Sequence, residues 1–520
     1  MAGTEPDALD GCRRAYRCLH PVASPSRGHT AVLMHPLEQR FPRVDAIVDY
    51  FGLGAGEAVA VESAYRTVHD VFGPIVTSAV DRMAHDFRAS VAQNPAHRIA
   101  FLGRDGHVLA GALRGLDPEF FERHCSEVVL SRRLADDALR DAEYSLGIEN
   151  AQVAGLRSDR RRSPQEVSGS ARMLTRYLRS AGVPVGRTDS AVTVVDNGFK
   201  GSIQELLGAL YDRTTFSGAY MAYLGTPNDP HPGTKRGYLV DMPTGPGSPF
   251  DFLPQDPAYT FASLEGVYAF EYLLGGPLTS AERIERSGPV QGLQSRIPMD
   301  WSGLTFINPV LVDERLRSPA TRDAVKAGAW LAIHDYARTH ADSGASRESL
   351  DIQRDAGTEQ VHNWVARSGP VEPELHSLLN SFAPRMDAPS VLRLYTALAK
   401  ERLPAAAVRP WWDDLAKMTH NHDKASYVGK AEAELRKPEI REAWANWAVS
   451  QGIPVEPAGT KGRLPVSIVT AGWAPASTAL SSSAQSARSA TGRSDERGPT
   501  QNNTIDTSRR SAQEQRGPEA

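Results

Sequence analysis

The feature that most constrains the fold is a repeated order of short apolar strands and longer amphipathic segments. The clearest case is an apolar strand over residues 191–198, followed at once by a helical pattern over residues 201–212. Another apolar run covers residues 216–225, and two earlier ones cover residues 97–103 and 126–133. Strands that alternate with helices are typical of an α/β layer. We therefore expect a Rossmann-like, mostly parallel sheet with helices on both faces.

The chain changes character after this α/β domain, which we assign to residues 45–295. Helical patterns such as residues 312–340 predict a helical domain over residues 296–455. Residues 456–520 consist mostly of small and polar residues, which cannot bury enough apolar surface to offset the entropy lost on ordering. We expect a disordered tail there and a flexible lead-in over residues 1–44.

Composition excludes several classes of protein. The 520 residues include 58 Lys and Arg against 62 Asp and Glu, and the resulting net charge of −4 argues against a nucleic-acid partner. No apolar run approaches the roughly 18 residues of a membrane span, and the first residues lack the apolar core of a secretory signal. Three cysteines, Cys12, Cys18 and Cys125, cannot build a disulfide framework, so we expect a cytoplasmic protein. The sequence does not indicate its oligomeric state.

The most informative motif is VVDNGFKGSIQELL, in which Asp196 ends an apolar strand and a helix begins near Ser202. Gly198 and Gly201 permit positive φ and close backbone approach, and a helix N-terminus offers free N–H groups. With the charge of Lys200, this pattern predicts a phosphate cradle that also includes Asn197. Asp196 could hold a sugar diol or a metal ion. The alternative is an ordinary strand–turn–helix connection capped by Ser202.

A second motif, FLGRDGHVLAGAL, places Arg104, Asp105 and Gly106 in a turn after a strand. This turn supplies a cation, a carboxylate and a flexible backbone at a strand end, where α/β sheets bind ligands. It could equally be a turn in which Asp105 accepts backbone N–H groups.

A third motif, VVLSRR, ends a strand with Ser131, Arg132 and Arg133. Arginine suits bidentate contact with phosphate, so these residues predict an anion site on the same rim. The alternative is a pair of solvated charges. Two further acids, Glu265 and Glu271, lie in an apolar helical segment. One of them could face the crevice, or they could be exposed to solvent.

The three motifs resemble a region of bacterial proteins encoded with surface-glycan genes, in which the pattern reads approximately FLARDG…SRR…VDIGWRGSIQ…GLYLG. The resemblance covers roughly residues 60–290. Members of that group are commonly labelled haloacid-dehalogenase-like hydrolases. It implies that Ser131 serves as that fold's second motif and Asp196 as its metal-binding fourth. Such a phosphatase needs a nucleophilic Asp two positions before Asp105, where this chain has Gly103.

The order of the motifs also resembles type I phosphoribosyltransferases. That resemblance implies that Asp196 holds the ribose hydroxyls and that Lys200 to Ser202 bind the 5-phosphate. Arg104 and Arg132 would stabilise the departing pyrophosphate, and Mg²⁺ would bridge the phosphates with Asp196 as a protein ligand. Asn197 departs from the pattern, which has a second acid there.

The leading hypothesis is a phosphoribosyltransferase-like enzyme that acts on a phosphorylated sugar or nucleotide with Mg²⁺. Arg104, Asp105 and Asp196 are its expected catalytic residues. One alternative is a haloacid-dehalogenase-like phosphatase that uses Asp105. The other is an inactive scaffold protein that keeps the phosphate pocket for nucleotide or phosphosugar binding.

Overall fold

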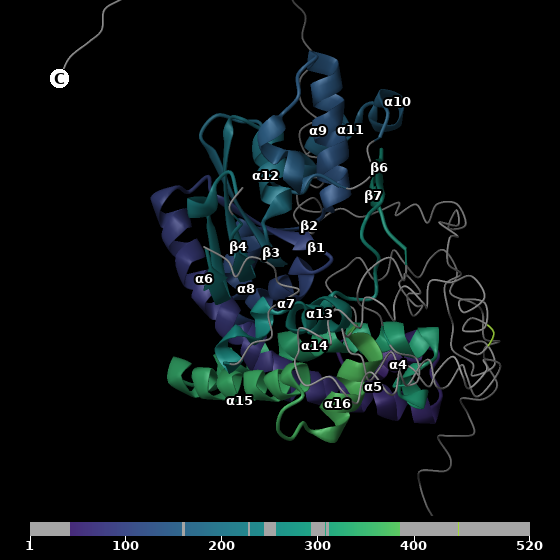
Figure 1. The fold of residues 1–520 in the computed structure, drawn as a ribbon. Helices are drawn as coiled ribbons and strands as arrows, with labels where there is room; N and C mark the ends of the chain where they lie inside the picture. Colours follow the sequence, from purple (N-terminus) through teal and green to yellow (C-terminus); the bar gives the residue numbers. More distant parts are fainter. Residues whose placement is uncertain are drawn as a thin grey trace, which may run out of the picture. The chain divides into compact units, whose positions relative to one another are not determined.

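The fold is taken from a computed structural model of the 520-residue chain (Figure 1). It describes residues 42–158, 162–226, 229–243, 256–292, Ile307, 311–384 and Asn446. The lead-in expected over residues 1–44 lies almost wholly outside the described residues. So do the expected tail and, apart from Asn446, the helical domain beyond residue 384.

A five-stranded parallel sheet forms the centre of the described residues, in the order β2-β1-β3-β4-β5. Its strands are β1 (Arg98–Gly103), β2 (Cys125–Val129), β3 (Ser190–Phe199), β4 (Thr214–Leu224) and β5 (Lys235–Met242). The expected parallel sheet is therefore confirmed, with β5 added to the strands read from the sequence. A separate antiparallel hairpin pairs β6 (Arg283–Glu285) with β7 (Gly288–Val290).

Helices cover both faces of the sheet, because alternate residues of each strand enter two different hydrophobic clusters. Ile99 and Phe101 of β1 join one cluster, whereas Ala100 and Leu102 join the other. The first face packs against α6 (Gly73–Gln93), α7 (Gly106–Leu116) and α8 (Pro118–His124). The second packs against α9 (Arg132–Leu146), α11 (Ser170–Ser180) and α12 (Ser202–Leu210).

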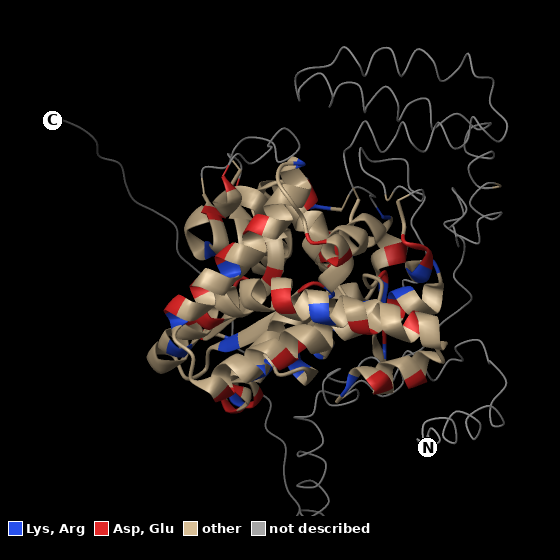
Figure 2. Ribbon diagram, turned by 90° about the horizontal axis from the view of Figure 1, so that it is seen from below, with Lys and Arg blue, Asp and Glu red and all other residues tan. Residues whose placement is uncertain are grey.

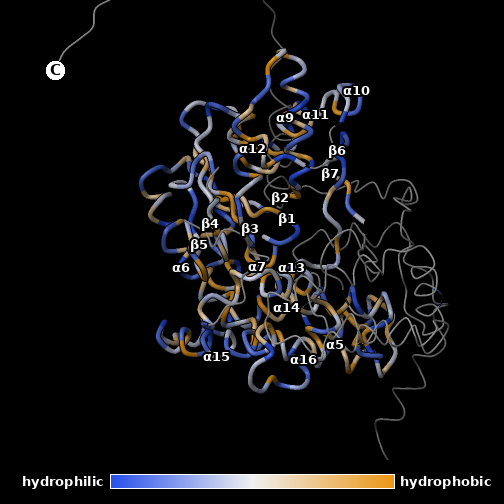
Figure 3. The backbone as a smooth tube through the Cα atoms, in the orientation of Figure 1, coloured by the Kyte–Doolittle hydropathy of each residue, from blue (hydrophilic) through white to orange (hydrophobic). Residues whose placement is uncertain are grey.

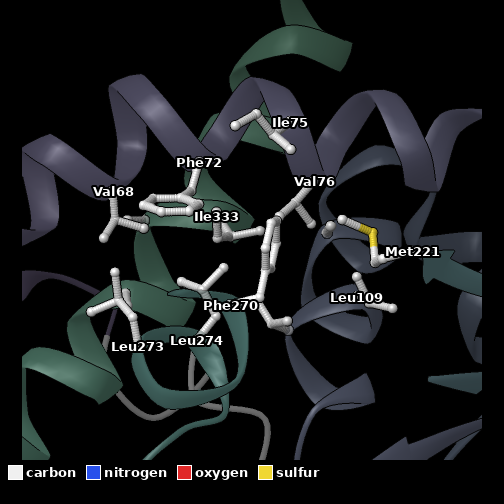
Figure 4. Close-up of a cluster of buried hydrophobic side chains, with 14 of the residues drawn as sticks. Val68, Phe72, Ile75, Val76, Leu109, Met221, Phe270, Leu273, Leu274 and Ile333 are labelled. Atoms are coloured by element: carbon white, nitrogen blue, oxygen red, sulfur yellow. The ribbon is translucent and has the colours of Figure 1, made fainter. Parts of the chain in front are cut away.

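A helical layer shares the core of the first face. It comprises α4 (Val44–Phe51), α5 (Ala55–Thr67), α13 (Leu264–Leu274), α14 (Pro319–Ser343), α15 (Arg347–Ala366) and α16 (Pro373–Phe382). Figure 4 shows Phe270 of α13 and Ile333 of α14 packed among Phe72, Val76 and Met221, which come from the π-helix η2 (Val68–Phe72), α6 and β4. The α/β part and the helical layer thus bury apolar surface together.

Local sequence sets the ends of several elements. A helix begins after Ser163, with a capping box between Ser163 and Glu166, and the helical segment is divided into α10 (Pro164–Val167) and α11. The division falls at Gly169, whose φ of 80° no other residue type adopts readily. The strand expected to reach Arg133 stops at Val129, because Ser131 caps α9 instead.

Charge and hydropathy follow this layering. Basic and acidic residues are interspersed along the outer helices (Figure 2), in keeping with the small net charge. Apolar segments gather in the strands at the centre (Figure 3). Of the helices in the described part of the chain, none combines the length and the apolar character that crossing a membrane requires.

Candidate functional site

A pocket of about 890 Å³ lies at the carboxyl ends of the parallel strands. In the order β2-β1-β3-β4-β5, the strand β1 lies between β2 and β3. The connection from β1 to β2 and the connection from β2 to β3 therefore run in opposite directions along the sheet. Sheets of this kind bind ligands in the crevice outside this switch point, and the volume is that of a typical small-molecule site. The pocket is lined by the ends of β1, β2, β3 and β4, by α13, by the segment 279–282 and by Gly155 and Ser158.

Eleven of the twelve residues predicted from the sequence line this one pocket, from three separate segments of the chain. They are Arg104, Asp105, Ser131, Arg132, Arg133, Asp196, Asn197, Gly198, Lys200, Gly201 and Ser202. The remaining one, Gly106, is buried at the start of α7 and is not among the lining residues. A Cβ atom there would lie 2.7 Å from the Val195 carbonyl oxygen, so glycine at this position permits close packing of α7 on β3.

The strand expected to end at Asp196 continues to Phe199, because its last residues still pair with β4, so only Lys200 and Gly201 connect β3 to α12. This short β3–α12 loop has the features expected of a phosphate cradle. Gly201 adopts φ 65° immediately before α12, and the described residues provide no side-chain cap for this helix. The N-terminus of α12 therefore keeps unpaired N–H groups at the pocket. Lys200 is exposed beside it and forms no ion pair with the described residues, so its charge is available to an anion.

The β1 loop is more constrained than the sequence indicated. Arg104 Nε donates to Asp105 Oδ1 at 2.9 Å, so this cation and this carboxylate partly neutralise each other. A Cβ atom on Gly275, at the end of α13, would lie 2.8 Å from Asp105 Oδ1. The pair is therefore enclosed between the sheet edge and α13.

The β2 loop divides its residues between structure and charge. Ser131 Oγ accepts a hydrogen bond from the Leu134 N–H as the cap of α9 and donates one to the Ala281 carbonyl at 2.6 Å. Arg133 lies 3.9 Å from Glu282, whereas Arg132 is exposed at the pocket. Ser131 thus has a structural role, and Arg132 is the cation best placed to meet a ligand.

The acids of the pocket carry poorly compensated negative charge. Asp196 is half-buried, and burial together with the charge of Asp105 raises its pKa to about 7, although its Oδ1 accepts the Asn197 N–H at 2.8 Å. Burial and Asp105 likewise raise the pKa of Glu271 to about 8. A cation or a set of hydrogen-bond donors bound here would stabilise the ionised carboxylates.

Glu271 is the main pocket residue that sequence reasoning left undecided. Its place in an apolar helical segment allowed either orientation, and the structure turns it to the pocket, whereas Glu265 is buried and bonded to Arg367. The lining segment 279–282 also gave no signal, because its path is set by contacts such as Ser131 with Ala281.

A buried ionic network supports the phosphate loop from beneath. The side chain of Lys235, the first residue of β5, is completely inaccessible to solvent and bonds Glu205 of α12 and Asp229. Its methylene stem lies so close to Gly201 that a Cβ atom there would approach Lys235 Cε to 2.6 Å. Nothing in the local sequence around Lys235 indicates this role, since its partners come from separate segments.

The residues fit a divalent cation in one specific way. Among the described side chains, no group of three His, Cys, Asp or Glu is arranged to hold a metal ion. Mg²⁺, however, is often held by one or two carboxylates with substrate phosphates and water completing its shell. Asp196, with its raised pKa beside a phosphate cradle, is suited to that role.

The fold and the pocket together define a doubly wound α/β protein with a candidate ligand site at the switch point of its sheet. Comparison with known proteins finds no family model and no curated protein that matches this chain.

Proposed function

We propose that the protein is a phosphoribosyltransferase-like enzyme that binds a phosphorylated sugar or nucleotide together with Mg²⁺. The observation that supports this most directly is the convergence of the Asp196–Ser202 loop, Arg104 and Arg132 on one pocket. A phosphate at the N-terminus of α12 would receive its N–H groups and the charge of Lys200. Arg132, which follows β2 on the other side of β1, would bind a second phosphate group of the same ligand.

Transfer in this site needs no covalent intermediate with the protein. An acceptor attacks the sugar carbon that bears the pyrophosphate, and the bond from that carbon to the pyrophosphate oxygen breaks. The pyrophosphate leaves with the electron pair, and the arginines stabilise the charge that develops on it. Mg²⁺, when bound, would neutralise part of the phosphate charge, and Asp196 would orient the sugar through its hydroxyl groups.

Position 103 distinguishes this proposal from the phosphatase alternative. A haloacid-dehalogenase-like mechanism needs a carboxylate nucleophile at the end of β1, two residues before Asp105. Gly103 occupies that position, and a Cβ atom there would lie 2.2 Å from His107 Nε2. A side chain at 103 would therefore require His107 to move. This favours transfer, or binding without turnover, over phosphoenzyme chemistry.

Titration calorimetry with phosphoribosyl pyrophosphate, with and without Mg²⁺, tests the proposal. We expect Mg²⁺-dependent binding that Asp196→Asn and Lys200→Ala each weaken at least tenfold. Arg213→Ala, which removes an exposed cation just before β4, should leave the affinity unchanged. No binding by the wild type, or equal binding by the two pocket variants, would refute the proposal. Binding without turnover for any acceptor would favour the inactive scaffold.

A further inference from the structure

Four carboxylates line the pocket, and they differ in what they already bind. Glu282 is largely exposed and lies 3.9 Å from Arg133. Asp105 is paired with Arg104 through both of its oxygens, at 2.9 and 3.4 Å. Asp196 accepts one backbone N–H on Oδ1. The carboxylate of Glu271 accepts no hydrogen bond from the residues that the structure describes, although it lines the pocket. Glu271 is therefore the acid most available to a ligand.

The phosphate cradle and Glu271 reach the pocket from opposite faces of the sheet. The buried residues of α12 belong to the cluster on the face covered by α9 and α11. Those of α13, which carries Glu271, belong to the cluster on the other face (Figure 1). A ligand whose phosphate lies at the N-terminus of α12 would extend across the strand ends towards α13.

We propose that Glu271 is a ligand-binding residue that accepts a hydrogen bond from a ring hydroxyl of the phosphorylated sugar, opposite Asp196. This inference rests on the proposed function and specifies its substrate as a sugar phosphate with adjacent hydroxyl groups. Two carboxylates that line the same pocket can each accept one hydroxyl of such a diol.

The neighbouring groups explain why the second carboxylate comes from α13. Within the Asp196–Ser202 loop, Asp196 is the sole acid, and the next residue, Asn197, is buried and uncharged. The charges around Glu271 are mixed, because Asp105 and Asp196 oppose its ionisation whereas Arg104 and Arg132 favour it. Hydroxyl donors suit this part of the pocket because they satisfy a carboxylate without adding charge.

The experiment compares ribose 5-phosphate with 2-deoxyribose 5-phosphate by titration calorimetry in the presence of Mg²⁺. We expect the wild type to prefer ribose 5-phosphate by about tenfold, the usual scale for a hydrogen bond to a charged group. Glu271→Gln should lose most of that preference while binding the deoxy sugar nearly as before. Glu359→Gln is the matched control, since Glu359 is exposed on α15 and does not line the pocket, and it should behave as the wild type.

A double variant guards against a merely structural effect of the substitution. Asn197→Asp combined with Glu271→Gln returns a second acid next to Asp196, and we expect it to recover at least part of the preference for ribose. Circular dichroism and thermal melting establish that each variant is folded.

The outcomes separate this inference from the proposed function. If the wild type binds ribose 5-phosphate and Glu271→Gln keeps the full preference for it, the assignment of Glu271 is wrong and the proposed function stands. If Glu271→Gln weakens both sugars equally, or changes only the Mg²⁺ dependence, Glu271 is a structural residue or a metal ligand, and the inference fails. If the wild type binds neither sugar phosphate, the proposed function fails and this inference fails with it.

Discussion

At the scale of single residues, the pocket depends on two places where a side chain has no room. Gly103 leaves the end of β1 without a nucleophile, against the imidazole of His107. Gly201 turns the chain into α12 with a positive φ, against the stem of Lys235 and the hydroxyl of Tyr220. Gly103 thus excludes a nucleophile at the end of β1, and Gly201 fixes the turn between β3 and α12.

Substitution of Gly201 by alanine tests the second of these constraints. The left-handed conformation costs a residue with a side chain about 1–2 kcal/mol, and the new Cβ would lie 2.6 Å from Lys235 Cε and 2.8 Å from the Tyr220 hydroxyl. We expect Gly201→Ala to lower the free energy of unfolding by about 2–4 kcal/mol, measured by urea denaturation. Gly208→Ala, in the same helix with open space around it, should instead raise it by about 0.5–1 kcal/mol. Equal effects of the two substitutions would contradict this explanation.

His97 predicts how stability depends on pH. It is buried at the start of β1, where Nε2 lies 2.7 Å from Thr193 Oγ1, and burial lowers its pKa below the ordinary 6.5. The unfolded chain therefore takes up a proton at a higher pH than the native protein does, and stability falls as the pH drops below 6.5. We expect the wild type to lose more stability than His97→Gln between pH 7 and pH 5, by urea denaturation. His85→Gln, at an exposed position, should follow the wild type.

At the scale of elements, α12 is held in place by charge as well as by packing. Lys235 of β5 bonds Glu205 of α12 and Asp229 of the preceding loop, and all three side chains are almost completely buried. The same loop region contributes Thr226 to the pocket. This network therefore fixes α12, and with it the turn at Lys200 and Gly201, relative to β4 and β5.

Removal of the ammonium group alone should be more damaging than removal of the whole network. Lys235→Met removes the counter-charge of the buried Asp229 and leaves Glu205 with His231, whose Nδ1 lies 2.7 Å from its carboxylate, as a basic partner. We expect a loss of about 3–5 kcal/mol in the free energy of unfolding. A triple variant that adds Glu205→Gln and Asp229→Asn should recover most of it, since no uncompensated charge then remains. If the triple variant is as unstable as Lys235→Met, the cost comes from packing and not from charge.

The elements also show how far the sequence could predict this molecule. Apolar periodicity located β1, β3, β4 and α12, and the residues at their ends indicated the pocket, because parallel strands bring their carboxyl ends to one edge. Periodicity could not decide the direction of Glu271, which depends on how α13 packs against other helices. It also could not reveal the partners of Lys235, since these meet only after β4 and β5 have paired.

At the scale of the whole described molecule, the helical layer packs against the helices of the sheet at several close contacts, and one of them is at Gly115. Gly115 of α7 faces α14, where a Cβ atom would lie 2.6 Å from the His334 carbonyl oxygen and 3.0 Å from Ala337 Cβ. Because backbone atoms cannot yield as a flexible side chain can, α7 approaches α14 this closely only with glycine at this position. The helix α13 belongs to the same packed core and carries Glu271 to the pocket.

Gly115→Ala tests whether the layer and the sheet unfold together. Forcing α7 away from α14 should cost about 1–3 kcal/mol, and a shared core predicts that both parts lose this stability in one transition. In a background in which the six other tryptophans are replaced by phenylalanine, tryptophan fluorescence reports on the layer through Trp330 and Trp364, and hydrogen exchange of β3 reports on the sheet. We expect both probes to shift to lower urea by the same amount, whereas Gly111→Ala, with open space in the same helix, should shift neither downward. A shift confined to the fluorescence probe would show that the helical layer is a separate folding unit, and Glu271 would then belong to a part that can move independently of the phosphate loop.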